Sequence, residues 1–328
     1  MAKRTKLEPA VETLYFTTSL PSLGGDTFYC DLSQMASIVN RRFYRQGINW
    51  AVAGVTMYTN ANTGVTISKL PNTWVTSNAW EKAFRLWNKQ QMDAIEDAGA
   101  ESAVARFRDF KVFADETHVD KFVSAGLDLN ATNLLPEDIT ATPFAGGEWE
   151  PAQIILPNAD IDPASGARTE PRENYLHMTG TNEHVSGPVA SRGIIEGYAD
   201  SRAYPQSPDP VSPAIDSGNN WMRAMFDVGN DNEEITDNAT DKNDNLPYPQ
   251  VNYPGGQIQG PTMQLHALAD VTATTVGAQT RLKGGTFPCG LMRIDLNNRT
   301  DGTAQYAFVI DLVPGTHRGY MCEPMTEM

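Results

Sequence analysis

Four stretches within the first 70 residues have the residue pattern of β-strands. They are rich in β-branched and aromatic side chains, and clusters of Pro, Gly and polar residues separate them. The clearest alternation places Val65 and Ile67 on one side of a strand and polar side chains on the other. The pattern predicts strands over residues 12–20, 27–32, 48–58 and 64–70.

Two helices are predicted in the same half of the chain. Ser33 is a candidate N-cap for a short helix over residues 33–39. A second helix begins near Asn78, and its aromatic residues Trp80, Phe84 and Trp87 follow the i, i+4, i+7 spacing of a single helix face. We expect this face to pack on the β core or to form a contact between subunits.

The middle of the chain has a different character. Prolines interrupt residues 114–258 and leave short strand-like segments at 149–156, 193–198 and 219–226. Residues 227–245 contain seven acids against a single lysine and show no apolar period, which predicts a solvated loop. Part of this loop resembles a calcium-binding loop, but Gly and Glu are missing where that motif requires them.

Strand patterns return at the C-terminus. Residues 263–276, 284–296 and 303–313 are rich in strand-forming side chains, and residues 297–302 have the composition of a hairpin loop between the last two. Short strands separated by long Pro-rich insertions favour an antiparallel sandwich or jelly roll over a parallel α/β sheet. We therefore predict an all-β fold.

Composition and charge narrow the function classes. The chain has 40 Asp and Glu against 25 Lys and Arg, which gives a net charge of −15. A net charge of this sign argues against a uniformly basic nucleic-acid coat. The charge is unevenly distributed, however, because the acids are concentrated in the middle and the N-terminal 50 residues are slightly basic. No apolar export segment follows the basic N-terminus, so we expect no membrane partner.

No motif of a common enzyme class occurs. The chain lacks GxGxxG, GxxxxGK[ST], GxSxG and HExxH, and its five His and three Cys are too scattered for a metal site or a disulfide framework. Glu148 and Glu150 are spaced as a glycosidase pair, but an exposed strand edge is the simpler explanation. Asp216 begins a triplet found in aspartic proteases, but its Pro-rich surroundings are explained more simply by a turn. We predict no enzyme activity, no bound metal and no cofactor.

Basic residues form two small clusters. Lys3, Arg4 and Lys6 lie at the N-terminus, and a second cluster follows the first predicted helix. In that second cluster, Arg41, Arg42, Tyr44 and Arg45 interleave cations with an aromatic ring, which suits phosphates and exposed bases. An equally good explanation is a helix C-terminus at which arginines complement the helix dipole.

Several segments together resemble the capsid proteins of small circular Rep-encoding single-stranded DNA viruses, and smacovirus-like capsid proteins in particular. They cover about a third of the chain, at both ends. The segments are 39–47 (VNRRFYRQG), 49–54 (NWAVAG), 69–75 (KLPNTWV), 287–291 (FPCGL) and 311–320 (DLVPGTHRGY).

The resemblance implies a single jelly roll of two antiparallel four-stranded sheets over residues 1–328, with one or two short helices. Residues 114–258 would form long surface loops or protruding insertions. It also implies self-assembly into an icosahedral T=1 shell around circular single-stranded DNA, so that the protein is found in the virion. The implied partners are copies of the chain, the viral DNA and a host receptor.

Many capsid proteins of this class begin with a long Arg-rich arm, and this chain does not. The expected DNA contacts are therefore the two basic clusters. The alternatives are a soluble β-sandwich protein that binds or hydrolyses glycans, and a phage accessory or spike protein.

Overall fold

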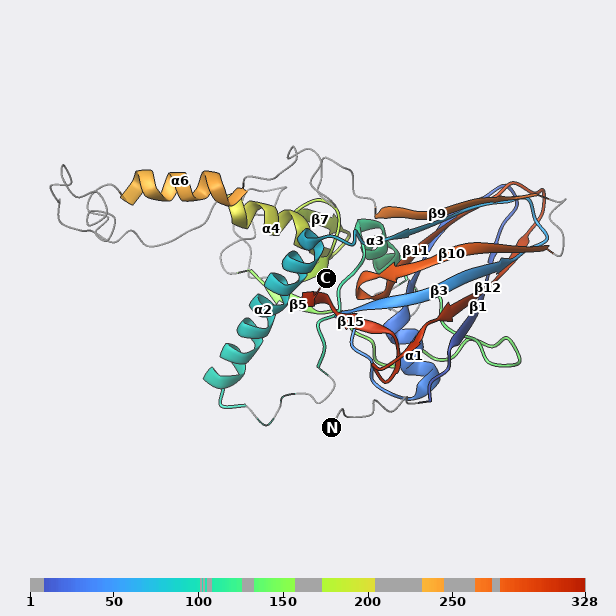
Figure 1. Ribbon diagram of the computed structural model, residues 1–328, viewed down its shortest axis with the longest axis horizontal. Helices are drawn as coiled ribbons and strands as arrows, with labels where there is room; N and C mark the ends of the chain where they lie inside the picture. Colours follow the sequence, from blue (N-terminus) through green and yellow to red (C-terminus); the bar gives the residue numbers. More distant parts are fainter. Residues whose placement is uncertain are drawn as a thin grey trace, which may run out of the picture.

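The computed structural model describes residues 9–100, 102, 104, 108–125, 133–156, 173–203, 232–244, 263–272 and 278–327. Two antiparallel sheets form a β-sandwich on the right of Figure 1, and a second group of helices and short strands lies on the left. The residues of this second group all come between two consecutive strands of the sandwich, so they form an insertion. The mostly antiparallel β architecture predicted from the sequence is confirmed.

The first sheet of the sandwich brings both ends of the chain together. Its order in space is β1 (Thr13–Leu20), β12 (Ala304–Leu312), β3 (Ile48–Tyr58) and β10 (Gln279–Phe287), and β15 (Cys322–Pro324) also pairs with β3. Thr13 lies opposite Asp311. The first and last long strands of the fold are therefore neighbours.

The second sheet has the same all-antiparallel pairing. Its order is β2 (Gly25–Asp31), β11 (Leu291–Asn298), β4 (Thr63–Lys69) and β9 (Gln264–Val271). A small separate ribbon of β13 (Pro314–Gly315) and β14 (Gly319–Tyr320) follows the first sheet, and a 3-10 turn, η7 (Met325–Glu327), ends the described chain.

The alternation in the sequence places one face of each sheet in a shared core. Phe16 of β1 and Phe308 of β12 are fully buried and stack with their ring centroids 5.0 Å apart. Ile67 and Ile294 reach the same core from the second sheet and are also fully buried. Tyr15, next to Phe16, points the other way and is 37% exposed, as the two-residue period of a strand requires.

Residues 284–296 were predicted as one strand, and this prediction is wrong. They form the end of β10, a 3-10 turn at η6 (Pro288–Gly290) and most of β11. Cys289 and Gly290 both have positive φ angles, of 56° and 67°, so the chain turns sharply and enters the other sheet. Two strands with a continuous apolar pattern cannot be distinguished from one by that pattern alone.

The predicted hairpin at residues 297–302 is also wrong. β11 and β12 flank this loop but belong to different sheets, so the loop crosses from one sheet to the other. It is fixed by neighbouring loops: Asn298 donates to the carbonyl of Pro21, and Arg299 donates its backbone N–H to Asn62. The residues predict a turn here, and a turn is present, but turn-forming residues do not specify which sheet each flanking strand joins.

The insertion lies between β4 and β9 and contains most of the helices. Its elements are α2 (Trp74–Asp97), α3 (Glu116–Ser124), α4 (Ile194–Ala203), α6 (Asn232–Asp244) and a four-stranded sheet. In that sheet the order is β5 (Gln153–Ile155), β6 (Glu173–His177), β8 (Val189–Gly193) and β7 (Glu183–Ser186). With α1 (Leu32–Asn40) before it, the described chain has five α-helices, where one or two short ones were expected.

Three local predictions for the insertion differ from the structure. The helix expected from Asn78 begins earlier, with Thr73 as its N-cap. Residues 193–198 were predicted as a strand, but Ile194 opens α4. Residues 232–244 of the expected acidic loop form α6, whose first turn carries Glu233 and Glu234, a placement that the helix dipole favours.

Buried polar side chains attach the insertion to the sandwich. The side-chain amide of Gln46 both donates to the carbonyl of Val112, at 3.1 Å, and accepts from its N–H, at 2.6 Å, as a neighbouring strand would. Asp115, the N-cap of α3, accepts from Tyr29 at 2.6 Å and from Arg293 at 2.8 Å. These contacts hold the segment before α3 against the outer face of the second sheet.

Candidate nucleic-acid interface

The basic cluster after α1 is placed by the two ends of that helix. Asp31 is the N-cap, and its carboxylate accepts from the backbone N–H of Ser33 at 2.9 Å and of Gln34 at 3.2 Å. The helix ends at Asn40, and its C-cap Arg41 takes a left-handed conformation with a φ of 53°. The chain therefore turns away from the helix axis, and both Arg41 and Arg42 are exposed.

Two further arginines lie next to them. The Arg45 side chain is 60% exposed; its guanidinium donates to the carbonyl of Arg108 at 3.0 Å and lies 3.9 Å from a carboxylate oxygen of Asp109. Arg318, from the turn between β13 and β14, is exposed and donates to the carbonyl of Phe43. We call the four exposed residues Arg41, Arg42, Arg45 and Arg318 the basic surface.

Tyr44 does not have the role expected from the sequence. It is 1% exposed, its hydroxyl donates to the carbonyl of Arg318 at 2.9 Å, and its ring packs edge-on against Tyr320 with centroids 5.4 Å apart. A ring in this position cannot stack on a base. Tyr44 instead fixes the position of Arg318 relative to Arg45, which is a structural role.

The N-terminus enters the fold beside the basic surface. The backbone N–H of Val11 donates to the side chain of Asn40, the last residue of α1, at 2.9 Å, and Tyr320 donates to the carbonyl of Val11 at 2.6 Å. Lys3, Arg4 and Lys6 lie outside the described residues.

Arg318 was not identified as a site residue from the sequence. It is far from Arg41 along the chain, and no short-range pattern connects the two. The pairing of β13 with β14 and the hydrogen bond from Tyr44 bring it to the surface that the other arginines occupy. The one feature of the sequence that could have drawn attention to Arg318 is its place in segment 311–320, which resembles capsid proteins.

Two carboxylates beside the segment that carries the basic surface, those of Asp31 and Asp109, are buried. Complete burial raises the pKa of Asp31 to about 6, against the hydrogen bonds from Gln46, Gln34, Trp149 and Ser33 that lower it. Burial also raises the pKa of Asp109, against a hydrogen bond from the Gln46 backbone. These two carboxylates therefore lie beneath the basic surface and not on it.

The aromatic face of α2 forms core contacts within the chain. Trp80 and Trp87 are each 6% exposed, and Phe84 is half-buried. Trp80 stacks on Phe84 at 5.2 Å, and all three rings surround Phe110 with centroids 5.4 to 5.8 Å away. The apolar cluster that holds these side chains also contains Tyr29 of β2 and Leu291 of β11, so the face of α2 packs between the insertion and the second sheet.

Of the three residues considered for catalysis, the structure describes Glu148 and Glu150. Glu148 and Glu150 are exposed on either side of the buried Trp149, and no strand begins there until Gln153. Asp216 lies outside the described residues. Among the residues that the structure describes, no group of three His, Cys, Asp or Glu side chains is arranged to hold a metal ion.

Comparisons of the chain with protein families, curated proteins and solved structures find no match. Within the described parts of the chain, no helix has both the length and the apolar character needed to span a membrane.

Proposed function

We propose that this chain is the coat protein of a small circular single-stranded DNA virus and that its sandwich is a single jelly roll. The observation that carries the proposal is the strand order. Numbered along the chain, the eight sandwich strands follow the order 1-8-3-6 in one sheet and 2-7-4-5 in the other. Successive strands along the chain alternate between the two sheets, except that the fourth and fifth strands, β4 and β9, are neighbours in one sheet, which is how a jelly roll winds.

The segments that resemble capsid proteins also meet in space, which supports the proposal. Four of the five, at 39–47, 49–54, 287–291 and 311–320, meet around Trp50 of β3, which is fully buried. Tyr44 and Tyr320 pack against its ring at 5.8 and 5.3 Å, and Phe287 lies opposite Trp50 in the neighbouring strand. Jelly rolls also occur in lectins and cupins, so the fold alone does not decide the function, and the basic surface is the second line of support.

The proposed shell is a closed icosahedral T=1 assembly of identical chains. Symmetric copies bury the same surface many times, so a modest contact per chain is sufficient for closure. We place the basic surface on the inside, where it faces DNA phosphates. In Figure 1, α6 lies far from α1, and its exposed acids suit the outer surface, where negative charge keeps shells apart.

Each chain then holds DNA weakly, and the shell holds it firmly. The basic surface has four arginines, and Lys3, Arg4 and Lys6 add charge from the adjoining N-terminus. Each phosphate contact releases counterions, and many chains act on one DNA molecule. DNA retention should therefore fall steeply with salt.

Assembly is the first test. The purified full chain is analysed by size-exclusion chromatography and negative-stain electron microscopy over a range of salt and pH. We expect closed particles of uniform diameter. A monodisperse monomer under every condition would overturn the proposed function.

The inward position of the basic surface is tested by replacing Arg41, Arg42 and Arg45 with Gln. We expect shells to form while nuclease-protected DNA per particle drops severalfold. The matched control replaces three exposed cations elsewhere, Arg85, Arg281 and Lys283, and so removes the same charge. Equal DNA content in both variants would show that the basic surface does not face the genome.

A further inference from the structure

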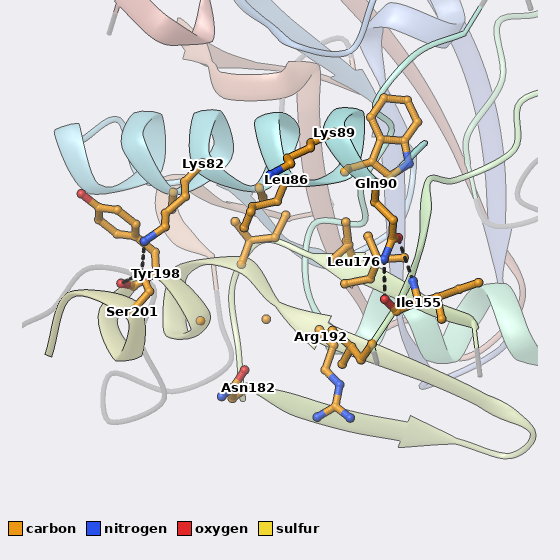
Figure 2. Close-up of a pocket in the computed structure, with 18 of the residues that line it drawn as sticks. Lys82, Leu86, Lys89, Gln90, Ile155, Leu176, Asn182, Arg192, Tyr198 and Ser201 are labelled. Carbon is orange, nitrogen blue, oxygen red and sulfur yellow. Dashed lines mark hydrogen bonds between the residues drawn. The ribbon is translucent and has the colours of Figure 1, made fainter. Parts of the chain in front are cut away.

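A groove in the insertion is separate from the basic surface. It runs between α2 on one side and α4, β5 and β8 on the other, and it has a volume of about 690 Å³. Figure 2 shows α2 above the groove, α4 and the strands below it, and Leu86 and Leu176 extending into the space between them. A volume of this size is within the range of small-molecule sites in proteins.

Polar bridges from α2 cross both ends of the groove. At one end, Lys82 donates to the hydroxyl of Ser201 at 2.6 Å. At the other end, the Gln90 amide donates to the carbonyl of Ile155 at 2.5 Å and accepts from its N–H at 3.0 Å. Lys82 and Gln90 are eight residues apart, so about 12 Å of helix separates the two bridges. The space between them is elongated.

The walls between the bridges are apolar. Ala83 and Leu86 line the groove from α2, and Leu176 and Ile194 line it from the opposite side. Leu86 remains 61% exposed and Ile155 46% exposed, so apolar surface is open to solvent here. Gly197 of α4 contributes no side chain, and a Cβ added there would meet only the Asn182 side chain, at an ordinary 3.8 Å. The groove suits a linear apolar ligand.

The side chains that line the groove carry a net positive charge, opposite in sign to the net charge of the whole chain. Lys82, Lys89 and Arg192 line it against a single acid, Asp93, although the chain carries a net charge of −15. The charge of Arg192 is partly compensated, because Glu183 lies 3.1 Å from its guanidinium. Lys89 is exposed and forms no ion pair or hydrogen bond within the described residues.

We propose that this groove binds an amphipathic monoanion, a linear hydrocarbon chain that ends in a carboxylate. The chain lies along α2 between the two bridges, and the carboxylate pairs with Lys89. Apolar burial supplies most of the affinity, because the walls are already formed and partly exposed. The lysine adds a charge-assisted hydrogen bond and so selects an anion over a neutral alcohol.

The test uses sodium decanoate, with decanol as the neutral ligand of equal length and acetate as the short anion. Binding to the full chain is measured by isothermal titration calorimetry below the concentration at which micelles form. We expect saturable binding of one decanoate per chain, roughly tenfold weaker binding of decanol, and no binding of acetate. Absence of saturable decanoate binding, or equal affinity for decanol, would overturn the proposal.

Two pairs of variants locate the site. Gly197→Leu fills the groove and should abolish decanoate binding, whereas Glu96→Leu, on the exposed face of α2, should leave it unchanged. Lys89→Gln should weaken binding about tenfold, and Arg85→Gln, which removes the same charge outside the groove, should not. Normal binding by Gly197→Leu would place the ligand elsewhere. If that variant does not fold by circular dichroism, Ala83→Leu on the opposite wall decides the question.

Discussion

The sandwich and the insertion are stabilised in different ways. In the sandwich, strands from opposite ends of the chain pair along their full length and bury a continuous apolar core, in which Phe16 and Phe308 stack. The strands of the insertion are short, and its junction with the sandwich combines an apolar cluster, in which Leu291 of the second sheet packs with Phe110, with buried polar groups such as Gln46 and Asp115. The comparison teaches that the sandwich core is apolar, whereas the junction adds specific hydrogen-bond partners to its apolar contacts.

The largest effect is expected from the sandwich core. Phe308→Ala removes a fully buried ring that stacks on Phe16, and we expect the free energy of unfolding to fall by about 3–5 kcal/mol, measured by urea denaturation. Tyr15→Ala, on the exposed face of the adjacent strand β1, is the control and should cost much less. Similar losses in the two variants would show that the sandwich core is not the dominant source of stability.

The junction is tested by Asp115→Ala. This change removes the buried acceptor of the Tyr29 hydroxyl and of one guanidinium N–H of Arg293, although Arg293 keeps its contact with Asp295, so we expect a loss of about 3 kcal/mol in the free energy of unfolding. Limited proteolysis should then cut the insertion before the sandwich. Asp120→Ala, on the same helix α3, removes an exposed side-chain contact with His184 of β7 and should cost less than about 1 kcal/mol. Protease resistance equal to the wild type in Asp115→Ala would contradict a polar junction.

The pH dependence of stability tests Asp31 at the same junction. Burial raises its pKa from 3.8 to about 6, so the folded protein binds more protons than the unfolded chain between these values. The contribution of Asp31 to the free energy of unfolding therefore falls as the pH rises from about 4 to about 6, by roughly 3 kcal/mol at most. Urea midpoints measured across this range in the wild type and in Asp31→Asn should show a flatter dependence in the variant. An unchanged slope would assign the dependence to other groups.

The smallest effect is expected on the outer face of the insertion. Arg85 pairs with Glu81 one turn earlier on α2, and its side chain is 75% exposed. Arg85→Gln should lower the free energy of unfolding by only about 0.3–0.5 kcal/mol. A loss above about 1 kcal/mol in the same urea experiment would mean that exposed contacts of α2 also stabilise the insertion.

The strands of the sandwich were largely predictable from their local residue content. Residues 12–20 are rich in β-branched and aromatic side chains, residues 48–58 alternate apolar and small residues, and β1 and β3 occupy nearly the same positions. The insertion was harder to predict. In α4, Ile194 and Ile195 look locally like strand residues, but the helix buries both against β6 and α2, a context that the sequence pattern does not contain.

The candidate interface was predictable only in part. Arg41, Arg42 and Arg45 follow a recognisable helix end, and all three are exposed. Tyr44 was assigned to the surface because it lies between them, yet its contacts with Trp50 and Tyr320 bury it. A single sequence position cannot reveal such a contact, because the partner rings come from other strands.

By itself, the sequence determined the β character of this protein, the positions of most sandwich strands, the aromatic face of α2 and the exposed arginines after α1. These features depend on local periodicity, capping and turn chemistry, which act over a few residues. Only the tertiary structure decided which sheet each strand joins, that Tyr44 is buried, and that Arg318 lies beside Arg45. Those outcomes depend on burial between distant segments, and the free energy of that burial exists only once the chain has brought the segments together.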